Sequence, residues 1–373
     1  WSDVAPLSFT DSTSFALGFS YAATKTVTGT ETNLLAGDFE GMQAAALMRF
    51  TGLPRDFSIP VNYQDSTWLE LTLVRRSPLS RNPVSLDVYK LNQVWVADST
   101  ALVQDANMTL ITTQSFTIPD TILATGTDVR VPIPTSAVLE WFNAANADTL
   151  GWSLVVKTNT NAWVEMRATE TGRGPQLRFK YLSGSPAEEK EYKARATRDS
   201  YRVTAPPAAM LENRWVLQNL SPSRVYLQFL DNFDLYKDMQ GNTLSEAHRK
   251  RVTINKAELI FHVKDNPYYG TSVQYSLRGD RVSRDSINAP VELTETDAVS
   301  GITTTTFVKG DSVIVNITPL IQAYSSGDET NRGVIIRSMQ EILNFGKLEL
   351  WHFSDAPDGK KPKLRVTYTP PYL

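Results

Sequence analysis

The sequence contains no cysteine. Without thiols the chain has no disulfide bond, no thiolate nucleophile and no cysteine-ligated metal site. It also lacks any apolar run close to the roughly 20 residues that a membrane-spanning helix needs, so we expect no transmembrane segment. Its 373 residues are nevertheless enough to bury a substantial apolar core without covalent or metal support.

A strong charge of one sign is missing as well. The 37 basic and 40 acidic residues give a formal net charge of −3, and the basic residues form no stripe along the chain. Nucleic-acid binding depends on a basic surface of that kind. We therefore expect no nucleic-acid partner.

The chain begins at Trp1 instead of methionine. This start is typical of a mature protein from which a signal peptide has been removed, and a truncated chain is the alternative. Secretion of a protein without cysteine favours a bacterium over a eukaryote. The expected location is therefore extracellular or on the surface of a bacterial cell.

What the sequence does contain is a long internal repeat. Residues 175–181 and 362–368 share the pattern Pro-x-Leu-Arg-x-x-Tyr, 187 positions apart. Further blocks precede each copy in the same order, at offsets between 179 and 188: residues 46–50, 68–73, 128–133 and 151–156 recur as 225–229, 256–261, 312–317 and 333–337. A constant order with drifting offsets is what loop insertions between fixed strands produce. The chain is therefore expected to hold two related domains in tandem.

The repeated blocks have the pattern of β-strands. Val129, Val131 and Ile133 alternate with Arg130 and Pro132, which is the period of two expected when one strand face points inward. Many such strands, separated by Gly, Pro, Asn and Asp, are typical of antiparallel sandwiches. The expected fold class is all-β, with two tandem antiparallel β-sandwich or jelly-roll domains and short helical turns.

The short helices are expected after the alternating strand of each copy, over residues 135–144 and 318–325. Thr135 and Thr318 are residue types that cap a helix N-terminus well. A third short helix is expected over residues 244–250.

The domain boundary is expected from composition. Residues 183–186 are a Ser-Gly-Ser-Pro breaker cluster, and residues 187–199 are dense in charge. A charged stretch after a breaker indicates an exposed linker or a solvated strand. The expected division is a first domain over residues 1–181, a charged linker over 182–196 and a second domain over 197–373.

The order of the repeated blocks resembles a known family. In each copy a segment ending in Phe50 or Phe229 precedes a Glu-Leu strand, the Val-x-Val-x-Ile strand, a short helix with an aromatic residue, a Gly-led strand and the closing strand. Ser354-Asp355 precedes the second closing strand. Over nearly the whole chain this order resembles the DNRLRE-type β-sandwich domains of bacterial extracellular proteins, although the hexapeptide that names the family is absent. Related jelly-roll modules include alginate-type carbohydrate binders, so the resemblance implies a secreted, non-catalytic module that binds glycans or builds surface structures.

No catalytic constellation stands out. His248, His262 and His352 lack the spacing of a metal site. Glycosidases need paired carboxylates, and two acidic positions occur in both copies of the repeat: Glu70 with Glu258, and Glu165 with Glu349. Apolar neighbours flank each of them, which favours structural positions on amphipathic strands over a duplicated active site. We expect no enzymatic activity.

Calcium is the one ion that the sequence leaves open. Secreted β-sandwiches bind calcium through oxygen ligands from scattered loops. Residues 355–359 and 327–329 are acidic loops, but neither has EF-hand spacing and both are equally typical of turns. No cofactor and no metal site are therefore predicted.

Aromatic residues are the best indication of a ligand surface. Tyr268 and Tyr269 lie between Pro267 and Gly270, where a loop can expose flat rings on which sugars stack. The tryptophans in strand or helix patterns are expected in the core: Trp95, Trp141, Trp152, Trp163, Trp215 and Trp351. Residues 278–280 match the integrin tripeptide Arg-Gly-Asp, a match short enough to arise by chance.

Two function classes remain. The first is a structural or adhesive protein that self-associates into an extracellular filament or surface layer; the second is a polysaccharide-binding protein. Trp1, Val4, Leu7 and Phe9 form an N-terminal arm that is too apolar to lie free. Because sandwich domains have open sheet edges, we expect this arm to contact the second domain or a neighbouring copy, which favours assembly.

Overall fold

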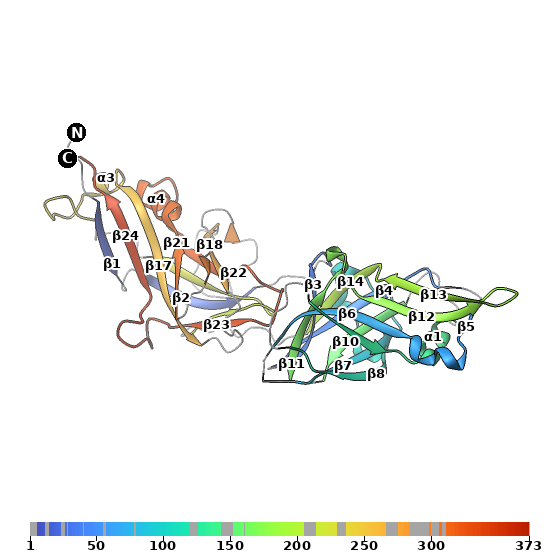
Figure 1. The fold of residues 1–373 in the computed structure, drawn as a ribbon. Coiled ribbons are helices and arrows are strands. Elements are labelled where there is room, and N and C mark those ends of the chain that lie inside the picture. The colour runs from blue at the N-terminus through green and yellow to red at the C-terminus, as the bar shows by residue number, and fades with distance from the viewer. Residues whose placement is uncertain are drawn as a thin grey trace. The chain divides into compact units, whose positions relative to one another are not determined.

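The fold is known from a computed structural model. It describes residues 6–11, 15–23, 27, 29–39, 41–54, 57–77, 80–119, 126–142, 152–159, 161–204, 214–229, 236–265, 275–283, 298–299, 306–307 and 311–372. The chain divides into two compact units. The central unit holds residues 26–206 and 343–345, and the terminal unit holds residues 1–25, 207–342 and 346–373. The expected all-β fold with two sandwich-like domains and few short helices is confirmed (Figure 1).

The central unit is a curled antiparallel sheet. Its strands run in the order β13-β12-β6-β11-β3-β4-β10-β7-β8, with β14 on β4, β5 on β12 and β9 on β6. They are β3 (Asn33–Phe39), β4 (Met42–Phe50), β5 (Phe57–Ser58), β6 (Trp68–Ser77), β7 (Val84–Leu91), β8 (Met108–Phe116), β9 (Thr127–Pro132), β10 (Trp152–Thr158), β11 (Ala162–Arg167), β12 (Gln176–Ser183), β13 (Glu188–Arg195) and β14 (Arg198–Thr204). The short helices are η1 (Val61–Ser66), η2 (Ala97–Leu102), η3 (Asp105–Asn107), α1 (Thr135–Phe142) and η4 (Thr169–Thr171).

The terminal unit repeats this arrangement. Its order is β1-β24-β17-β23-β15-β16-β22-β18-β19, with β2 on β16, β20 on β18 and β21 on β17. The strands are β1 (Leu7–Asp11), β2 (Phe15–Ala22), β15 (Trp215–Gln218), β16 (Ser223–Phe229), β17 (Thr253–Asp265), β18 (Ser276–Val282), β19 (Ala298–Val299), β20 (Thr306–Phe307), β21 (Ser312–Asn316), β22 (Val334–Ser338), β23 (Lys347–Leu350) and β24 (Lys363–Thr369). The helices are α3 (Glu246–Arg249) and α4 (Thr318–Ser326).

Alternating apolar residues explain why these segments form half-buried strands. Val313 and Val315 on β21 are buried, whereas Ile314 between them is 38% exposed. On β9, Val129 and Val131 are buried as well. Every block of the repeat is a strand, and matching blocks occupy matching places in the two sheets. The repeat therefore encodes sheet positions.

The domain boundaries differ from the expected ones. Residues 1–25 belong to the terminal unit. Residues 182–196 are not a linker, because β13 pairs with β12 from Gln176↔Arg195 to Ser183↔Glu188. The charge of this stretch is that of an edge strand, where exposed charged side chains are favoured, while Tyr192 turns into the core.

Helix capping also differs from the prediction, and Thr135 is the first residue of α1 and not its N-cap. The helices at 135, 246 and 318 lie within or beside the predicted ranges. Thr318 is the first residue of α4 and not its N-cap, which is Ile317. The Asn316 Oδ1 atom accepts hydrogen bonds from the Thr318 N–H at 3.0 Å and from its hydroxyl at 2.7 Å. Asn316 thus satisfies the donors that an N-cap would satisfy.

Candidate functional site

The first candidate site is the place where the start of the chain enters the terminal unit. We call β1 and β2 the N-terminal strand pair. Strand β1 runs antiparallel to β24, with Leu7 opposite Tyr368 and Phe9 opposite Val366 (Figure 1). Leu7 and Phe9 pack against the core, and the Phe9 ring lies 5.7 Å from the Tyr236 ring in an edge contact. The arm residues Trp1 and Val4 lie outside the described residues.

Strand β2 enters the core more deeply. It pairs with β16 from Ala22↔Ser223 to Phe15↔Phe229. Phe19 and Tyr21 are 2% and 1% exposed, and the Phe19 ring lies 5.2 Å from that of Tyr226. Burying each such side chain contributes roughly 1.5–3 kcal/mol. The N-terminal strand pair is therefore part of the hydrophobic core of the terminal unit.

Two small residues of β2 fit their surroundings closely. A Cβ atom at Gly18 would lie 2.8 Å from the Trp215 ring and 3.0 Å from Leu227, closer than real contacts allow. The buried Ser20 hydroxyl donates to the Arg214 carbonyl at 2.8 Å and accepts from the Val216 N–H at 2.7 Å. Shape and hydrogen bonding thus fix the register in which β2 docks.

We call the surfaces of β24 and β16 that receive β1 and β2 the seat of the N-terminal strand pair. His352 lies beside this seat. Its ring makes an edge contact with Trp215, with centroids 5.0 Å apart, and its Nδ1 atom lies 2.7 Å from the Ser354 hydroxyl. Burial lowers the pKa of His352, and this effect is opposed by a hydrogen bond that the ring donates to the backbone of Gly18. His262 contacts the Lys360 carbonyl at 3.2 Å, and His248 lies on α3.

The central unit has the same seat, filled from elsewhere in the chain. We call β13 and β14 the internal strand pair. Strand β13 lies beside β12 and β14 lies beside β4, the counterparts of β24 and β16. Tyr192 stacks on Phe179 at 4.9 Å, at the position where Phe9 packs in the terminal unit. Both units are closed by two edge strands that come from outside the repeated blocks.

The block comparison missed this correspondence, because the similar residues of the two strands lie one position out of register: Tyr21 pairs with Arg224, the counterpart of Ala45, whereas Tyr201 pairs with Ala46. Ser20-Tyr21-Ala22-Ala23-Thr24 and Ser200-Tyr201-Arg202-Val203-Thr204 share the pattern Ser-Tyr-x-x-Thr at an offset of 180, inside the range of the other blocks. Three matching residues are too few to be recognised without the strand pairing.

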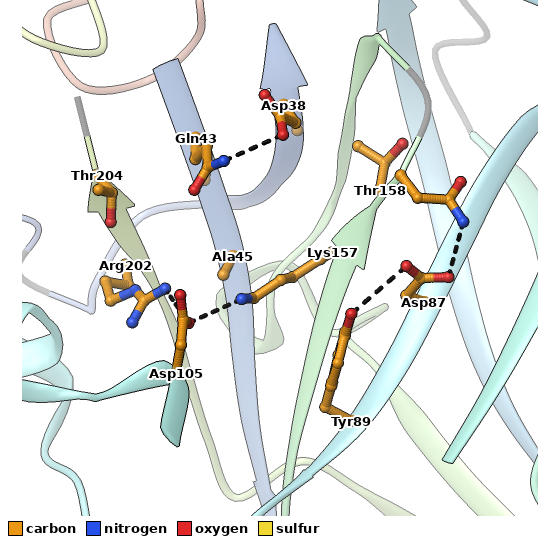
Figure 2. Close-up of a pocket in the computed structure, with 13 residues that line it drawn as sticks. Asp38, Gln43, Ala45, Asp87, Tyr89, Asp105, Lys157, Thr158, Arg202 and Thr204 are labelled. Carbon is orange, nitrogen blue, oxygen red and sulfur yellow. Dashed lines mark hydrogen bonds and ion pairs between the residues drawn. The ribbon is translucent and has the colours of Figure 1, made fainter. Parts of the chain in front are cut away.

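The second candidate site is a polar pocket of about 270 Å³ in the central unit (Figure 2). Asp105 on η3 lies between two cations, with the Lys157 Nζ atom at 2.8 Å and an Arg202 guanidinium nitrogen at 2.5 Å. Partial burial opposes ionisation of Asp105, but these hydrogen bonds prevail and its pKa is lowered. The Lys157 ammonium also lies 5.3 Å from the centre of the Tyr89 ring.

The opposite wall of the pocket presents an acceptor and an amide. The Asp87 carboxylate accepts from Thr113 at 2.7 Å and from Asn159 at 3.1 Å. Burial raises the pKa of Tyr89, and the nearby Asp87 charge adds to this effect. Side chains of this kind match the hydroxyl groups of a sugar. Asp105, Lys157 and Arg202 are already paired with one another, which gives the pocket a structural role even when it is empty.

The duplicated carboxylates form ion pairs across neighbouring strands. Glu258 accepts from Arg365 at 2.6 and 2.8 Å, and Glu70 lies 3.7 Å from Arg178. Arg178 and Arg365 are the arginines of the Pro-x-Leu-Arg-x-x-Tyr repeat. One repeated motif therefore pairs with the other, and burial, which would raise the pKa of Glu258, is outweighed by its cations.

The second carboxylate pair is more deeply buried. Glu165 accepts from the Asn33 amide at 2.6 Å and lies 3.3 Å from Arg75; burial raises its pKa. Its counterpart Glu349 accepts from Arg214 at 2.5 and 3.0 Å. Hydrogen bonds from Arg214 outweigh burial there and lower the pKa of Glu349. Both carboxylates hold strands together.

The two acidic loops are engaged as well. Asp355 accepts from Lys264 at 2.7 Å, and Asp328 accepts from the Ser326 hydroxyl at 2.6 Å. Within the described residues no three His, Asp or Glu side chains lie close enough together to hold a metal ion.

The remaining aromatic and adhesive candidates divide clearly. Tyr268 and Tyr269 lie outside the described residues, as does the side chain of Trp141. Trp351 is only half-buried, with the Lys264 ammonium 5.0 Å from its ring, and the other tryptophans predicted for the core are buried: Trp95, Trp152, Trp163 and Trp215. Asp280 of the Arg-Gly-Asp match is fully buried between Arg278 and Arg337, so it cannot be presented to a receptor.

Comparison of the chain with protein-family models and with curated proteins found no match. None of the helices in the described residues has the length and apolar character that crossing a membrane requires.

Proposed function

We propose that this protein is a non-catalytic structural or adhesive subunit of an extracellular filament or surface layer. The observation that carries this proposal is that the start of the chain supplies two edge strands to the unit formed by its end. A sheet edge that pairs with strands from the start of the chain can pair in the same way with those strands from another copy, and copies of one protein can be joined by this pairing. The resemblance of the repeated blocks to extracellular β-sandwich domains supports the same function and a bacterial surface location.

Removal of the arm tests this function. We expect a variant that lacks residues 1–9 to lose assembly, because the pairing of β1 with the edge of β24 and the contacts of Phe9 are lost. Size-exclusion chromatography and electron microscopy of the full and shortened proteins measure the effect. A shortened protein that assembles and melts like the full chain would contradict the proposal.

The second candidate function is polysaccharide binding, favoured by the polar pocket of the central unit. Gln43 and Asn159 line it and do not belong to its ion pairs. If the pocket binds glycans, replacing both by alanine should abolish signals on a glycan array, while the exposed Ser115→Ala on β8 should not. The Tyr268/Tyr269 loop is the other candidate platform, and double alanine substitution tests it on the same array.

A further inference from the structure

The two strand pairs occupy equivalent seats but have different places in the chain. The internal strand pair follows the repeated blocks of the central unit, and four residues separate the end of β12 from the start of β13. No strand pair follows β24, the matching end of the terminal unit, among the described residues up to 372. The edge of β24 is covered instead by β1, and β16 is covered by β2; both strands precede every block of the repeat.

The connections that lead out of the two pairs have the same length. Ten residues, 23–32, separate β2 from β3, and ten residues, 205–214, separate β14 from β15. Along the chain, the N-terminal strand pair is followed by the blocks of the central unit, then by the internal strand pair and finally by the blocks of the terminal unit. Within the chain, the second strand pair closes the blocks that come before it. By the same rule, the first strand pair would close a set of blocks other than those that follow it directly, and the blocks at the end of another copy of the chain offer the same surface.

We propose that the N-terminal strand pair of one copy docks on the preceding copy, with β1 beside its β24 and β2 beside its β16, so that the copies join head to tail by strand exchange. This proposal rests on the assembly function above and names its partner and contact. Contacts of Phe9, Phe19 and Ser20 with the seat are the same whether the seat belongs to the same chain or to another. In a monomer the strand pair docks on its own chain and closes it. In a polymer each strand pair docks on the next copy, which gives an open row of copies.

The protein concentration determines whether closed monomers or joined copies form, because both use the same contact between the strand pair and its seat. Because the strand pair and the blocks that it closes are tethered in one chain, the chain's own strand pair has an effective concentration on the order of 1 mM. We therefore expect closed monomers in dilute solution and joined copies when protein is refolded near that concentration or confined at a surface.

The absence of cysteine makes a direct test possible. Ser8 on β1 faces Thr367 on β24, and antiparallel neighbours lie about 4.5–5.5 Å apart between Cα atoms, within disulfide range. Two full-length variants, Ser8→Cys and Thr367→Cys, are mixed, unfolded in urea, refolded together at concentrations from about 10 μM to about 1 mM, and oxidised. The matched control is a mixture of Lys180→Cys and Glu191→Cys, which face each other between β12 and β13.

We expect a disulfide-linked dimer from Ser8→Cys with Thr367→Cys, rising from under about a tenth of the protein to about a quarter over this range, because only half of the exchanged strands meet the complementary cysteine. The control mixture should give no dimer, because the four-residue turn holds β13 to its own β12. Absence of the dimer at the highest concentration, or equal dimer in the control, would overturn strand exchange. Electron microscopy of the unmodified protein then separates the two proposals: filaments without exchange leave assembly standing on another surface, and dispersed monomers remove both.

Discussion

At the residue scale, the repeat preserves side chains that hold strands together. Glu258 and Arg365 join β17 to β24, and the corresponding Glu70 and Arg178 join β6 to β12. In the sequence, the repeated glutamates and the repeated arginines are two separate matches. Only the strand register shows that each glutamate contacts the arginine of the same unit. The same ion pair in both units explains why acidic residues recur at these strand positions.

Asp199 on β14 should make stability depend on pH. It accepts two hydrogen bonds from Thr169, at 2.8 and 2.9 Å, and burial raises its pKa from 3.8 to about 6. A raised pKa means that its contribution to the free energy of unfolding is complete below about pH 4 and is lost as the pH rises through about 6. We expect Asp199→Asn to match the wild type at pH 4 and to exceed it by up to about 2–3 kcal/mol at pH 7.

Urea unfolding across this pH range measures the difference between the two proteins. The hydrogen bonds to Thr169 are kept in part by the asparagine amide, so the pH dependence of the difference is the diagnostic quantity. A constant difference at every pH would show that Asp199 ionises normally.

Gly18 should be intolerant of a side chain. Trp215 and Leu227 lie on the path of its missing Cβ atom, and overpacking of this kind typically costs about 1–3 kcal/mol. We expect Gly18→Val to lower the free energy of unfolding by that amount and to weaken assembly. Ala22→Val on the same strand is the control, because Ala22 is exposed; equal effects of the two substitutions would refute the close fit.

At the element scale, the edge strands are the elements through which the proposed assembly would occur. Strands β1 and β13 each pair along one side only, with β24 and β12. An edge strand with charged outward residues and one buried aromatic, such as β13, has almost the composition of a linker. This is why residues 182–196 were expected to be a linker, and why the domain boundary was placed on the wrong side of the internal strand pair.

Moving the N-terminal strand pair within the chain should abolish assembly without harming the fold. Tyr368 near the end of β24 lies opposite Leu7 at the start of β1, so a four-residue turn like residues 184–187 can join them. We expect a permuted protein, with residues 6–22 moved to follow β24, to stay monomeric at every concentration. Its melting temperature should stay close to that of the natural chain. Light scattering over a concentration series is the measurement, and assembly equal to that of the natural chain would count against a role for the strand pair in joining copies.

At the scale of the whole molecule, the chain is a repeat whose parts are offset by one strand pair. Each unit has the same strand order, yet one is continuous in sequence apart from residues 343–345, and the other is built from both ends of the chain. In a longer array of the same modules, every strand pair but the first would close the blocks before it. The first and last elements are thus complementary, which is the property that a head-to-tail polymer requires.

The sequence by itself determined the fold class, the duplication and the places of most strands. Period-two alternation and loop punctuation are local properties, and burial in any sandwich satisfies them. It could not determine which strands are neighbours, because pairing between β1 and β24 joins residues more than 350 positions apart and leaves no local pattern. Only the tertiary structure decided that the start of the chain completes the unit at its end, since edge selection depends on which backbone donors and acceptors remain unpaired once the other strands have assembled.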